Sequence, residues 1–290
     1  MVHATGVAED PLERSIQLRR AWGLSEARKA ARVTKENGLE HTYLKLAGAA
    51  VFKGVPRVDL RSAISQARIL DYRDDEVIIA RGDPGDRVFV IISGIVRIGT
   101  LAENGKRVTI EILREQEVFG ELGVIDRKPR IADVVATGPT KVAAIPAPEF
   151  LELLSRSPVF AVNLLRLTTA RLRRCYTLFE DASLMSLEHR FARQVLYLMR
   201  LGAAGGRRVR IYSRLHQGEL ADLLGATPRS IINILNKWRS DGLVEFDGRA
   251  AQLTILDLER FNALVGDETS RKCERPRQVA ASGRRNPHRS

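Results

Sequence analysis

The chain has 290 residues, of which 44% are hydrophobic and 28% are charged. This composition excludes collagen-like and wholly disordered chains, and the length predicts about two domains. The apolar runs are too short to cross a membrane, and residues 1–15 carry acidic side chains where a signal peptide needs an apolar core. We therefore expect a cytoplasmic protein with no membrane partner.

The sequence offers little support for a metal site or an enzyme. Two cysteines, Cys175 and Cys273, are too few for a disulfide framework and are wrongly spaced for zinc. No glycine-rich loop of the nucleotide-hydrolysing kind is present, and the five histidines are scattered. We therefore predict no metal site and no catalytic residues.

The formal net charge of +12 is concentrated toward the C-terminus. Residues 183–290 contain 19 Lys and Arg against 11 Asp and Glu, so they carry eight of the twelve excess positive charges. A basic region of this kind is typical of proteins that bind double-stranded DNA. A basic surface that is merely well solvated is the alternative that charge alone leaves open.

Residues 1–50 form a polar, helix-prone extension without strand-like alternation. From Glu76 the apolar period becomes two, and turn residues such as Asp83 to Asp86 separate the apolar runs. Residues 51–157 are therefore predicted to form an antiparallel β-roll or barrel. Its short strands are expected at 76–80, 87–101, 106–113, 133–137 and 141–145.

A long helix is predicted over residues 158–183. Apolar or small residues recur there at spacings of four and three, from Ala161 to Ala182, and most charged residues lie outside this stripe. The pattern predicts a homodimer formed by a pair of parallel helices. A helix packed on its own domain would show a similar stripe, which is the alternative. The predicted dimer seam consists of Leu165, Thr168, Leu172, Cys175 and Phe179.

Residues 217–236 have the pattern of a helix-turn-helix. The first helix has one apolar face (Leu220, Leu223, Leu224), small Ala221 allows close packing, and Gly225 suits the tight turn. In the second helix, Thr227 is the expected N-cap and Pro228 the first residue. Its buried face is predicted to consist of Ile231, Ile234, Leu235 and Trp238.

The opposite face of this second helix is polar and basic, as expected of a helix that enters the major groove of DNA. Arg229 and Asn233 are suited to guanine and adenine contacts, whereas Ser230 and Lys237 suit phosphate. A helical hairpin with an ordinary solvated face is the alternative. The predicted DNA-binding residues are Thr227, Arg229, Ser230, Asn233, Asn236 and Lys237.

After Trp238, the dipeptide Asp247-Gly248 lies between alternating apolar positions and predicts a two-stranded wing, with Arg249 at its tip. Residues 184–265 are therefore predicted to form a winged helix-turn-helix domain. Residues 266–290 are basic and rich in polar residues, and we expect a disordered tail.

From Phe52 to Phe261 the chain resembles the cyclic-AMP receptor protein/FNR (Crp/Fnr) family of bacterial transcription regulators. The motifs that carry the resemblance are GDPGDRVFVIISG from Gly82, FGELGVIDRKPRIA from Phe119, the central helix and the winged helix. The resemblance implies an α+β fold: an N-terminal cyclic-nucleotide-binding-like β-roll that acts as a sensor, a long dimerisation helix and a C-terminal winged helix-turn-helix. It also implies RNA polymerase as a partner and activation as an output.

In cyclic-nucleotide-binding members, the second motif, here the cassette of residues 119–132, holds the nucleotide. Arg130 would neutralise the cyclic phosphate and Glu121 would accept a hydrogen bond from the ribose. Ile131 replaces a hydroxyl that donates to phosphate, a loss worth about 1.5–3 kcal/mol. Cys175 and Tyr176 replace the two hydroxyl residues that hold adenine. The ligand-binding residues implied by the resemblance are Gly120, Glu121, Leu122, Arg130, Ile131, Ala132, Cys175 and Tyr176.

Three alternatives stay open for the sensor: cyclic AMP or another cyclic nucleotide, another small ligand, or no ligand. Tyr176 could stack on a purine or fill the pocket itself. An iron–sulfur cluster of the FNR kind is not supported, because no cysteine precedes Cys175. Arg229 stands where the family often has glutamate, so we expect an altered operator that keeps two-fold symmetry. A cyclic-nucleotide-binding module that acts on a protein partner is a second function class, and the winged helix argues against it.

Overall fold

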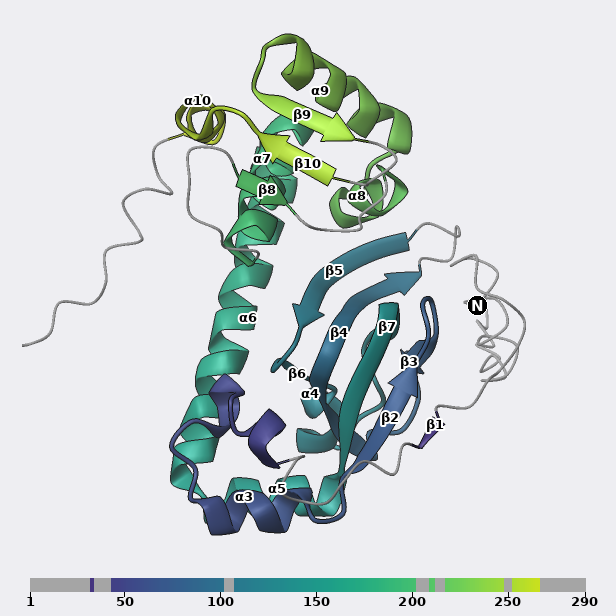
Figure 1. Ribbon diagram of the computed structural model, residues 1–290, viewed down its shortest axis with the longest axis vertical. Coiled ribbons are helices and arrows are strands. Elements are labelled where there is room, and N and C mark those ends of the chain that lie inside the picture. Colours follow the sequence, from purple (N-terminus) through teal and green to yellow (C-terminus); the bar gives the residue numbers. More distant parts are fainter. Residues whose placement is uncertain are drawn as a thin grey trace, which may run out of the picture. The chain divides into compact units, whose positions relative to one another are not determined.

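The computed structural model describes residues 32–33, 43–101, 107–201, 209–211, 217–247 and 252–266 (Figure 1). The predictions for the rest of the N-terminal extension and for residues 267–290 lie outside these ranges. The chain divides into two compact units. One contains a large antiparallel sheet, and the other contains helices and a small sheet.

The large sheet has seven strands among the described residues, and every pairing is antiparallel, as predicted for the β-roll. The main path runs in the order β1-β2-β7-β4-β5, while β3 pairs with β7 and β6 with β4. The long strands β4 and β7 lie side by side (Figure 1). The strands are β1 (Arg32–Val33), β2 (Arg68–Tyr72), β3 (Val77–Ile79), β4 (Arg87–Leu101), β5 (Arg107–Arg114), β6 (Val118–Phe119) and β7 (Asp133–Pro146).

Strand β4 is apolar on both faces because it contributes to two cores. Val88 and Val90 point into one apolar cluster, which the helices also line. Phe89 and Ile91 point into a second cluster inside the roll, where the Phe89 ring stacks on Phe119 with centroids 5.1 Å apart. Successive side chains of β4 therefore point alternately into two apolar clusters, rather than alternately into a core and into solvent.

Two strand predictions were wrong. The segments expected as separate strands at 133–137 and 141–145 form one strand, β7, because residues 138–140 bulge opposite Gly94 without ending the pairing with β4. The extension was expected to contain no strand, yet β1 pairs with β2 through Arg32–Asp71 and Val33–Leu70. A two-residue strand is too short to produce a readable sequence period.

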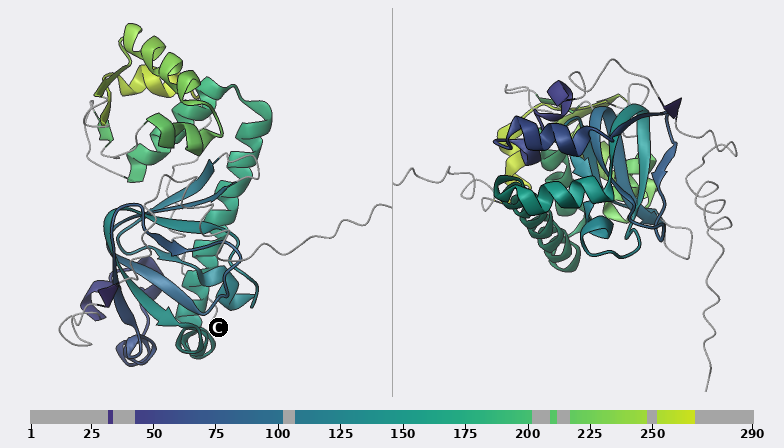
Figure 2. Two further views of the ribbon diagram at one scale, coloured as in Figure 1. Left: turned by 90° about the vertical axis from the view of Figure 1, so that its right-hand side faces the viewer. Right: turned by 90° about the horizontal axis from the view of Figure 1, so that it is seen from below.

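Helices cover one end of the sheet, where α3 and α5 pack side by side (Figure 2). The predicted long helix is confirmed as α6, whose start is fixed by aromatic packing. Phe160 stacks on Phe52 at 5.6 Å and meets Phe150 edge-on at 5.4 Å. The Asn163 side-chain amide donates to the carbonyl of Lys53 at 2.8 Å. The elements are η1 (Ala50–Phe52), α3 (Arg57–Ile64), α4 (Glu121–Ile125), α5 (Ala147–Arg156) and α6 (Pro158–Leu184).

The second unit contains a three-stranded antiparallel sheet in the order β8-β10-β9. The predicted wing hairpin is confirmed, with Asp247 paired to Gln252 and Val244 to Ile255. The predicted turn at Gly248 and Arg249 lies outside the described residues. The remaining elements of the chain are α7 (Leu187–Leu201), β8 (Val209–Ile211), α8 (Gln217–Leu224), α9 (Pro228–Ser240), β9 (Val244–Asp247), β10 (Gln252–Ile255) and α10 (Leu258–Ala263).

Candidate DNA interface and sensor site

The two helices predicted over residues 217–236 are present as α8 and α9. In α8, Leu220, Ala221 and Leu224 are buried, as predicted for its apolar face, while Leu223 is half-buried. Gly225 ends the helix with φ +59°, a left-handed conformation that suits glycine. The local sequence alone therefore explains why the chain turns here.

The start of α9 is also set locally. Thr227 caps the helix: its hydroxyl oxygen accepts a hydrogen bond from the Ser230 N–H at 3.2 Å and lies 2.9 Å from the Ser230 hydroxyl. Pro228 occupies the first helical position, where no N–H is needed. Both predictions are confirmed, and they fix where the amino end of α9 begins.

The faces of α9 separate as the sequence predicts. Ile231, Leu235 and Trp238 are buried, and Ile234 is half-buried. The predicted DNA-binding side chains all lie away from this buried face: Ser230 is half-buried, and Thr227, Arg229, Asn233, Asn236 and Lys237 are exposed. The contacts of these side chains with DNA stay a prediction.

Lys237 is not a free cation. Its Nζ atom lies 2.9 Å and 3.0 Å from the two carboxylate oxygens of Glu188 on α7, and the Trp238 Nε1–H donates to the same carboxylate at 3.0 Å. The prediction that Lys237 binds phosphate therefore needs Glu188 to release it. Sequence reasoning missed Glu188, and its place in the first turn of α7 gave no signal of a partner 49 residues later.

In the sensor cassette, Gly120 joins β6 to α4 with φ +80°. A Cβ atom there would lie 3.0 Å from Arg130 Nη1 and 3.1 Å from the Ile79 side chain. The Arg130 guanidinium donates to the Gly120 carbonyl, and also to the Arg87 carbonyl at 2.7 Å. The backbone thus folds tightly around this arginine.

Arg130 is almost fully buried and also faces Asp86 at 3.6 Å. Burial lowers the pKa of Arg130, and Asp86 acts in the opposite direction. Three internal acceptors therefore hold the guanidinium that the family resemblance assigns to a phosphate. A phosphate in this site would have to replace or share these acceptors.

Glu121 is buried and ion-paired with Arg171 on α6, whose Nη1 lies 2.7 Å from its carboxylate. Arg171 also donates to the Val118 carbonyl at 2.6 Å and faces Glu111 at 3.4 Å. Burial raises the pKa of Glu111, and the charge of Arg171 acts against it. Sequence reasoning missed Arg171. Two observations could have indicated it: a buried glutamate needs a cation, and Arg171 lies one helical turn before Cys175, which the family resemblance already placed at the ligand site.

The other predicted ligand residues are not all gathered at the cassette. Ala132, two residues after Arg130, is buried, whereas Leu122 is 39% exposed and Ile131 is 64% exposed. Cys175 and Tyr176 are exposed on α6. Gly120, Glu121 and Arg130 form the compact part of the site.

A cavity of about 310 Å³ opens beside Arg130, which is near the lower size limit of small-molecule sites. Leu70, Ile78 and Phe89 give it apolar walls, and Tyr72 adds a hydroxyl. Burial raises the pKa of Tyr72 to about 12, and Arg87 acts in the opposite direction. The phenol is therefore protonated at neutral pH and can donate a hydrogen bond.

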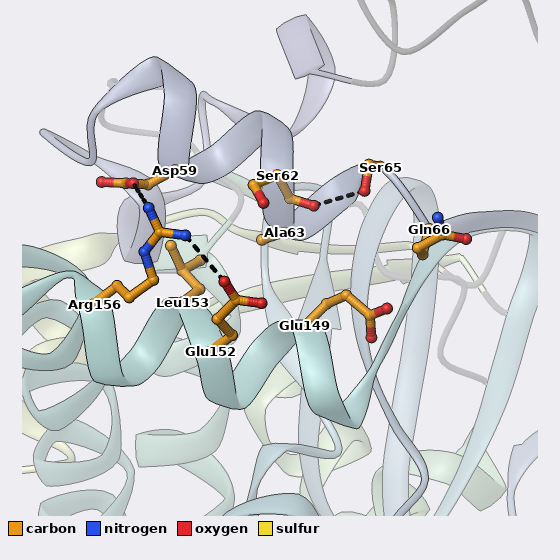
Figure 3. Close-up of a pocket in the computed structure, with 9 residues that line it drawn as sticks. All are labelled: Asp59, Ser62, Ala63, Ser65, Gln66, Glu149, Glu152, Leu153 and Arg156. Atoms are coloured by element: carbon orange, nitrogen blue, oxygen red, sulfur yellow. Dashed lines mark hydrogen bonds and ion pairs between the residues drawn. The ribbon is translucent and has the colours of Figure 1, made fainter.

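A second cavity, of about 200 Å³, lies between α3 and α5 (Figure 3). Arg156 crosses it and pairs with Asp59 at 3.6 Å and with Glu152 at 3.0 Å. The charges of this cavity thus hold α3 to α5. The cavity beside Arg130 is the better candidate for a small ligand.

Two family models match the chain. Residues 69–157 match the cyclic nucleotide-binding domain, and residues 189–264 match the Crp-like helix-turn-helix domain. The chain belongs to the Crp/Fnr family of transcription regulators. This Crp/Fnr regulator therefore combines a ligand-sensing type of domain with a DNA-binding domain, and its family consists of regulators rather than enzymes.

The regulator is 29% identical over 217 residues to the CRP-like cAMP-activated global transcriptional regulator of Mycobacterium tuberculosis, covering 74% of this chain and 96% of that protein. It is also 29% identical to the cyclic AMP receptor protein of Thermus thermophilus, covering 68% and 88%. FixK2 from Bradyrhizobium japonicum has the same fold, with a TM-score of 0.62, 22% identity and coverage of 69% and 98%.

The described part of this Crp/Fnr regulator holds no group of three or more His, Cys, Asp or Glu placed to bind a metal ion. Its described helices include none with the length and apolarity needed to span a bilayer. The matched helix-turn-helix domain favours DNA over a protein partner as the output of the sensor.

Proposed function

We propose that this Crp/Fnr regulator works as a homodimer whose two α9 helices read a palindromic operator. The observation that carries this proposal is the exposed apolar stripe of α6: Leu165, Leu172 and Phe179 are 66%, 56% and 72% exposed. Burying such side chains against a second copy gains about 25 cal/mol for each Å² removed from water. Two-fold symmetry would then place the recognition helices about 34 Å apart, one turn of DNA.

Base selectivity is assigned to the amino-terminal half of α9. Arg229 and Asn233 are four residues apart on one face, so both can reach base edges in one major groove. Thr227, Ser230 and Asn236 surround them and suit backbone or base contacts. The side chains of Arg229 and Asn233 are both exposed, as direct contact with base edges requires.

The DNA proposal is tested by selecting duplexes from a random pool with the purified full-length chain. The expected result is an inverted repeat, with much weaker binding to either half alone and with an affinity that falls as salt rises. Selection of a single, non-repeated site, or binding that is independent of salt, would contradict the proposal. Sedimentation of the free chain gives the oligomeric state independently.

A small ligand is proposed as the signal, and cyclic nucleotides are the first candidates. Gly120, Glu121 and Arg130 support this, as does the relative named as cAMP-activated. Ile131 and the internal partners of Arg130 reduce the expected affinity. Calorimetric titration with cyclic AMP and cyclic GMP, repeated on Arg130→Gln, tests this: heat lost in the variant supports the site. No heat from either nucleotide with the wild type points to another ligand or to none.

Activation through contact with RNA polymerase, in the cytoplasm, is the output that we propose. In vitro transcription from a promoter that carries the selected operator tests it. Higher transcript yield with the regulator supports activation, whereas lower yield indicates repression.

A further inference from the structure

Glu188 on α7 contacts two consecutive residues of the recognition helix α9. Both carboxylate oxygens accept from Lys237 Nζ, and Oε1 also accepts from Trp238 Nε1. The hydrogen bond from Lys237 is the largest cause that lowers the pKa of Glu188, while desolvation acts against it. Glu188 is therefore an anion at neutral pH, placed beside a helix that is expected to approach DNA.

The position of Glu188 is fixed from several directions. Ser186 caps α7 by accepting from the His189 N–H at 3.3 Å, so Glu188 falls in the first turn, where an acidic residue is favoured. Phe191, one turn further along α7, stacks on Trp238 with centroids 4.8 Å apart. Because Trp238 is completely buried, its indole N–H needs an acceptor inside the protein, and Glu188 provides it.

This arrangement changes what Lys237 can do. The Lys237 side chain is 58% exposed, so solvent and phosphate can reach it, but its charge is matched by Glu188 at 2.9 Å. A DNA phosphate that approaches Lys237 also approaches the anion. The pair thus contributes no net charge to binding, although the sequence assigns Lys237 to the DNA-facing side.

We propose that Glu188 is a positioning residue with two effects on α9: it anchors the helix through Trp238, which supports base selectivity, and it withholds the Lys237 ammonium from DNA phosphate, which lowers the affinity for every sequence. The proposal rests on the proposed DNA-reading role of α9. Sequence-independent affinity comes from contacts between cations and phosphates, whereas base contacts supply selectivity. Masking one cation therefore weakens binding to specific and random duplexes to a similar degree and leaves base contacts by Arg229 and Asn233 intact.

The test is Glu188→Gln, which keeps an oxygen acceptor for the Trp238 N–H and removes the charge. We expect higher affinity for specific and random duplexes alike, an unchanged ratio of specific to random affinity, and a plot of log affinity against log salt that is steeper by about 0.9. The double variant Glu188→Gln/Lys237→Met should return to the wild-type slope. Lys237→Met alone leaves the Glu188 anion unmatched, so its affinity for all duplexes should fall and its slope should be no steeper than that of the wild type.

A matched control is Glu259→Gln, which removes one negative charge from an exposed position on α10. Its salt slope should equal that of the wild type, since it masks no cation of α9. Glu188→Leu removes the acceptor of Trp238 as well, and the ratio of specific to random affinity should fall by about tenfold, the effect of one misplaced base contact.

The outcomes separate this inference from the proposed function. A Glu188→Gln protein that binds random duplexes no better than the wild type, or a Glu188→Gln/Lys237→Met protein with a slope flatter than that of the wild type, would overturn the role of Glu188 while DNA binding stands. A wild-type chain that binds no duplex would contradict both. Circular dichroism of each variant establishes that the fold is retained.

Discussion

Arg171 on α6 and Glu121 in the sensor cassette are joined by an ion pair of 2.7 Å across 50 residues of sequence. Arg171 also donates a hydrogen bond to the carbonyl of Val118, the residue that begins β6. The cassette and the helix with the proposed dimer seam are thus directly linked. A ligand that displaces Glu121 must move Arg171 with it or break a buried pair.

Removing the cation of this pair should be costly. Arg171→Met leaves the Glu121 carboxylate, whose side chain is 3% exposed, without its partner, and we expect a loss of about 3 kcal/mol in the free energy of unfolding. Urea denaturation measures it. The matched control, Arg173→Met, changes an exposed position on the same helix and should shift stability by less than about 0.5 kcal/mol. Equal losses in the two variants would show that Arg171 has no special role.

Arg229 should determine one base of the operator. Arg229→Ala is expected to cost about 1–3 kcal/mol on the selected site and to relax base preference at one position in each half-site. Competition binding with single-base variants of the operator measures this. A uniform loss over all sequences would instead assign Arg229 to the phosphate backbone.

The α6 stripe should be the dimer interface. Leu172→Lys would place like charges on both sides of the seam, and we expect monomers in sedimentation experiments. Cys175 is exposed on the same stripe, so a variant with Cys273→Ser should form a disulfide-linked dimer under mild oxidation. A Leu172→Lys protein that stays dimeric would place the interface elsewhere.

Stability should fall with rising pH because of Glu117. Burial raises the pKa of Glu117 above 4.5, while the Arg114 N–H, which donates to it at 2.7 Å, acts in the opposite direction. The folded state therefore binds this proton more tightly than the unfolded chain. The resulting stability is fully present below about pH 4.5 and is lost as pH rises through the raised pKa.

Glu117→Gln should remove this dependence, so its stability relative to the wild type should increase from pH 4.5 through the raised pKa. The free energy of unfolding, measured over that range, is the readout. Glu115→Gln, at an exposed neighbouring position, provides the control and should follow the wild type. A constant difference between Glu117→Gln and the wild type at all pH values would contradict the argument.

Much of the recognition element could be predicted from the sequence because its determinants are local. The Thr227 cap, the proline at the helix start and the Gly225 turn each depend on residues within four positions. The apolar period of α9 then defined its buried face. The same local logic correctly placed β4 and α6.

The features that the sequence did not reveal depend on partners far along the chain. The Glu188–Lys237 and Arg171–Glu121 pairs span 49 and 50 residues. The sequence around each carboxylate does not indicate which cation it pairs with. The continuity of β7 was also hidden, because Gly138-Pro139 reads as a break unless the bulge opposite Gly94 is known. In each case tertiary contacts decided the outcome.

Trp238 offers a spectroscopic consequence. Its indole is enclosed by Phe191 and Phe261 and hydrogen-bonded to Glu188, and Trp22 is the other tryptophan of the chain. The tryptophan fluorescence of a Trp22→Phe protein would therefore come from Trp238 alone, which lies on the proposed recognition helix. Its emission would record the docking of an operator, or the arrival of a signal from the sensor, without any attached label.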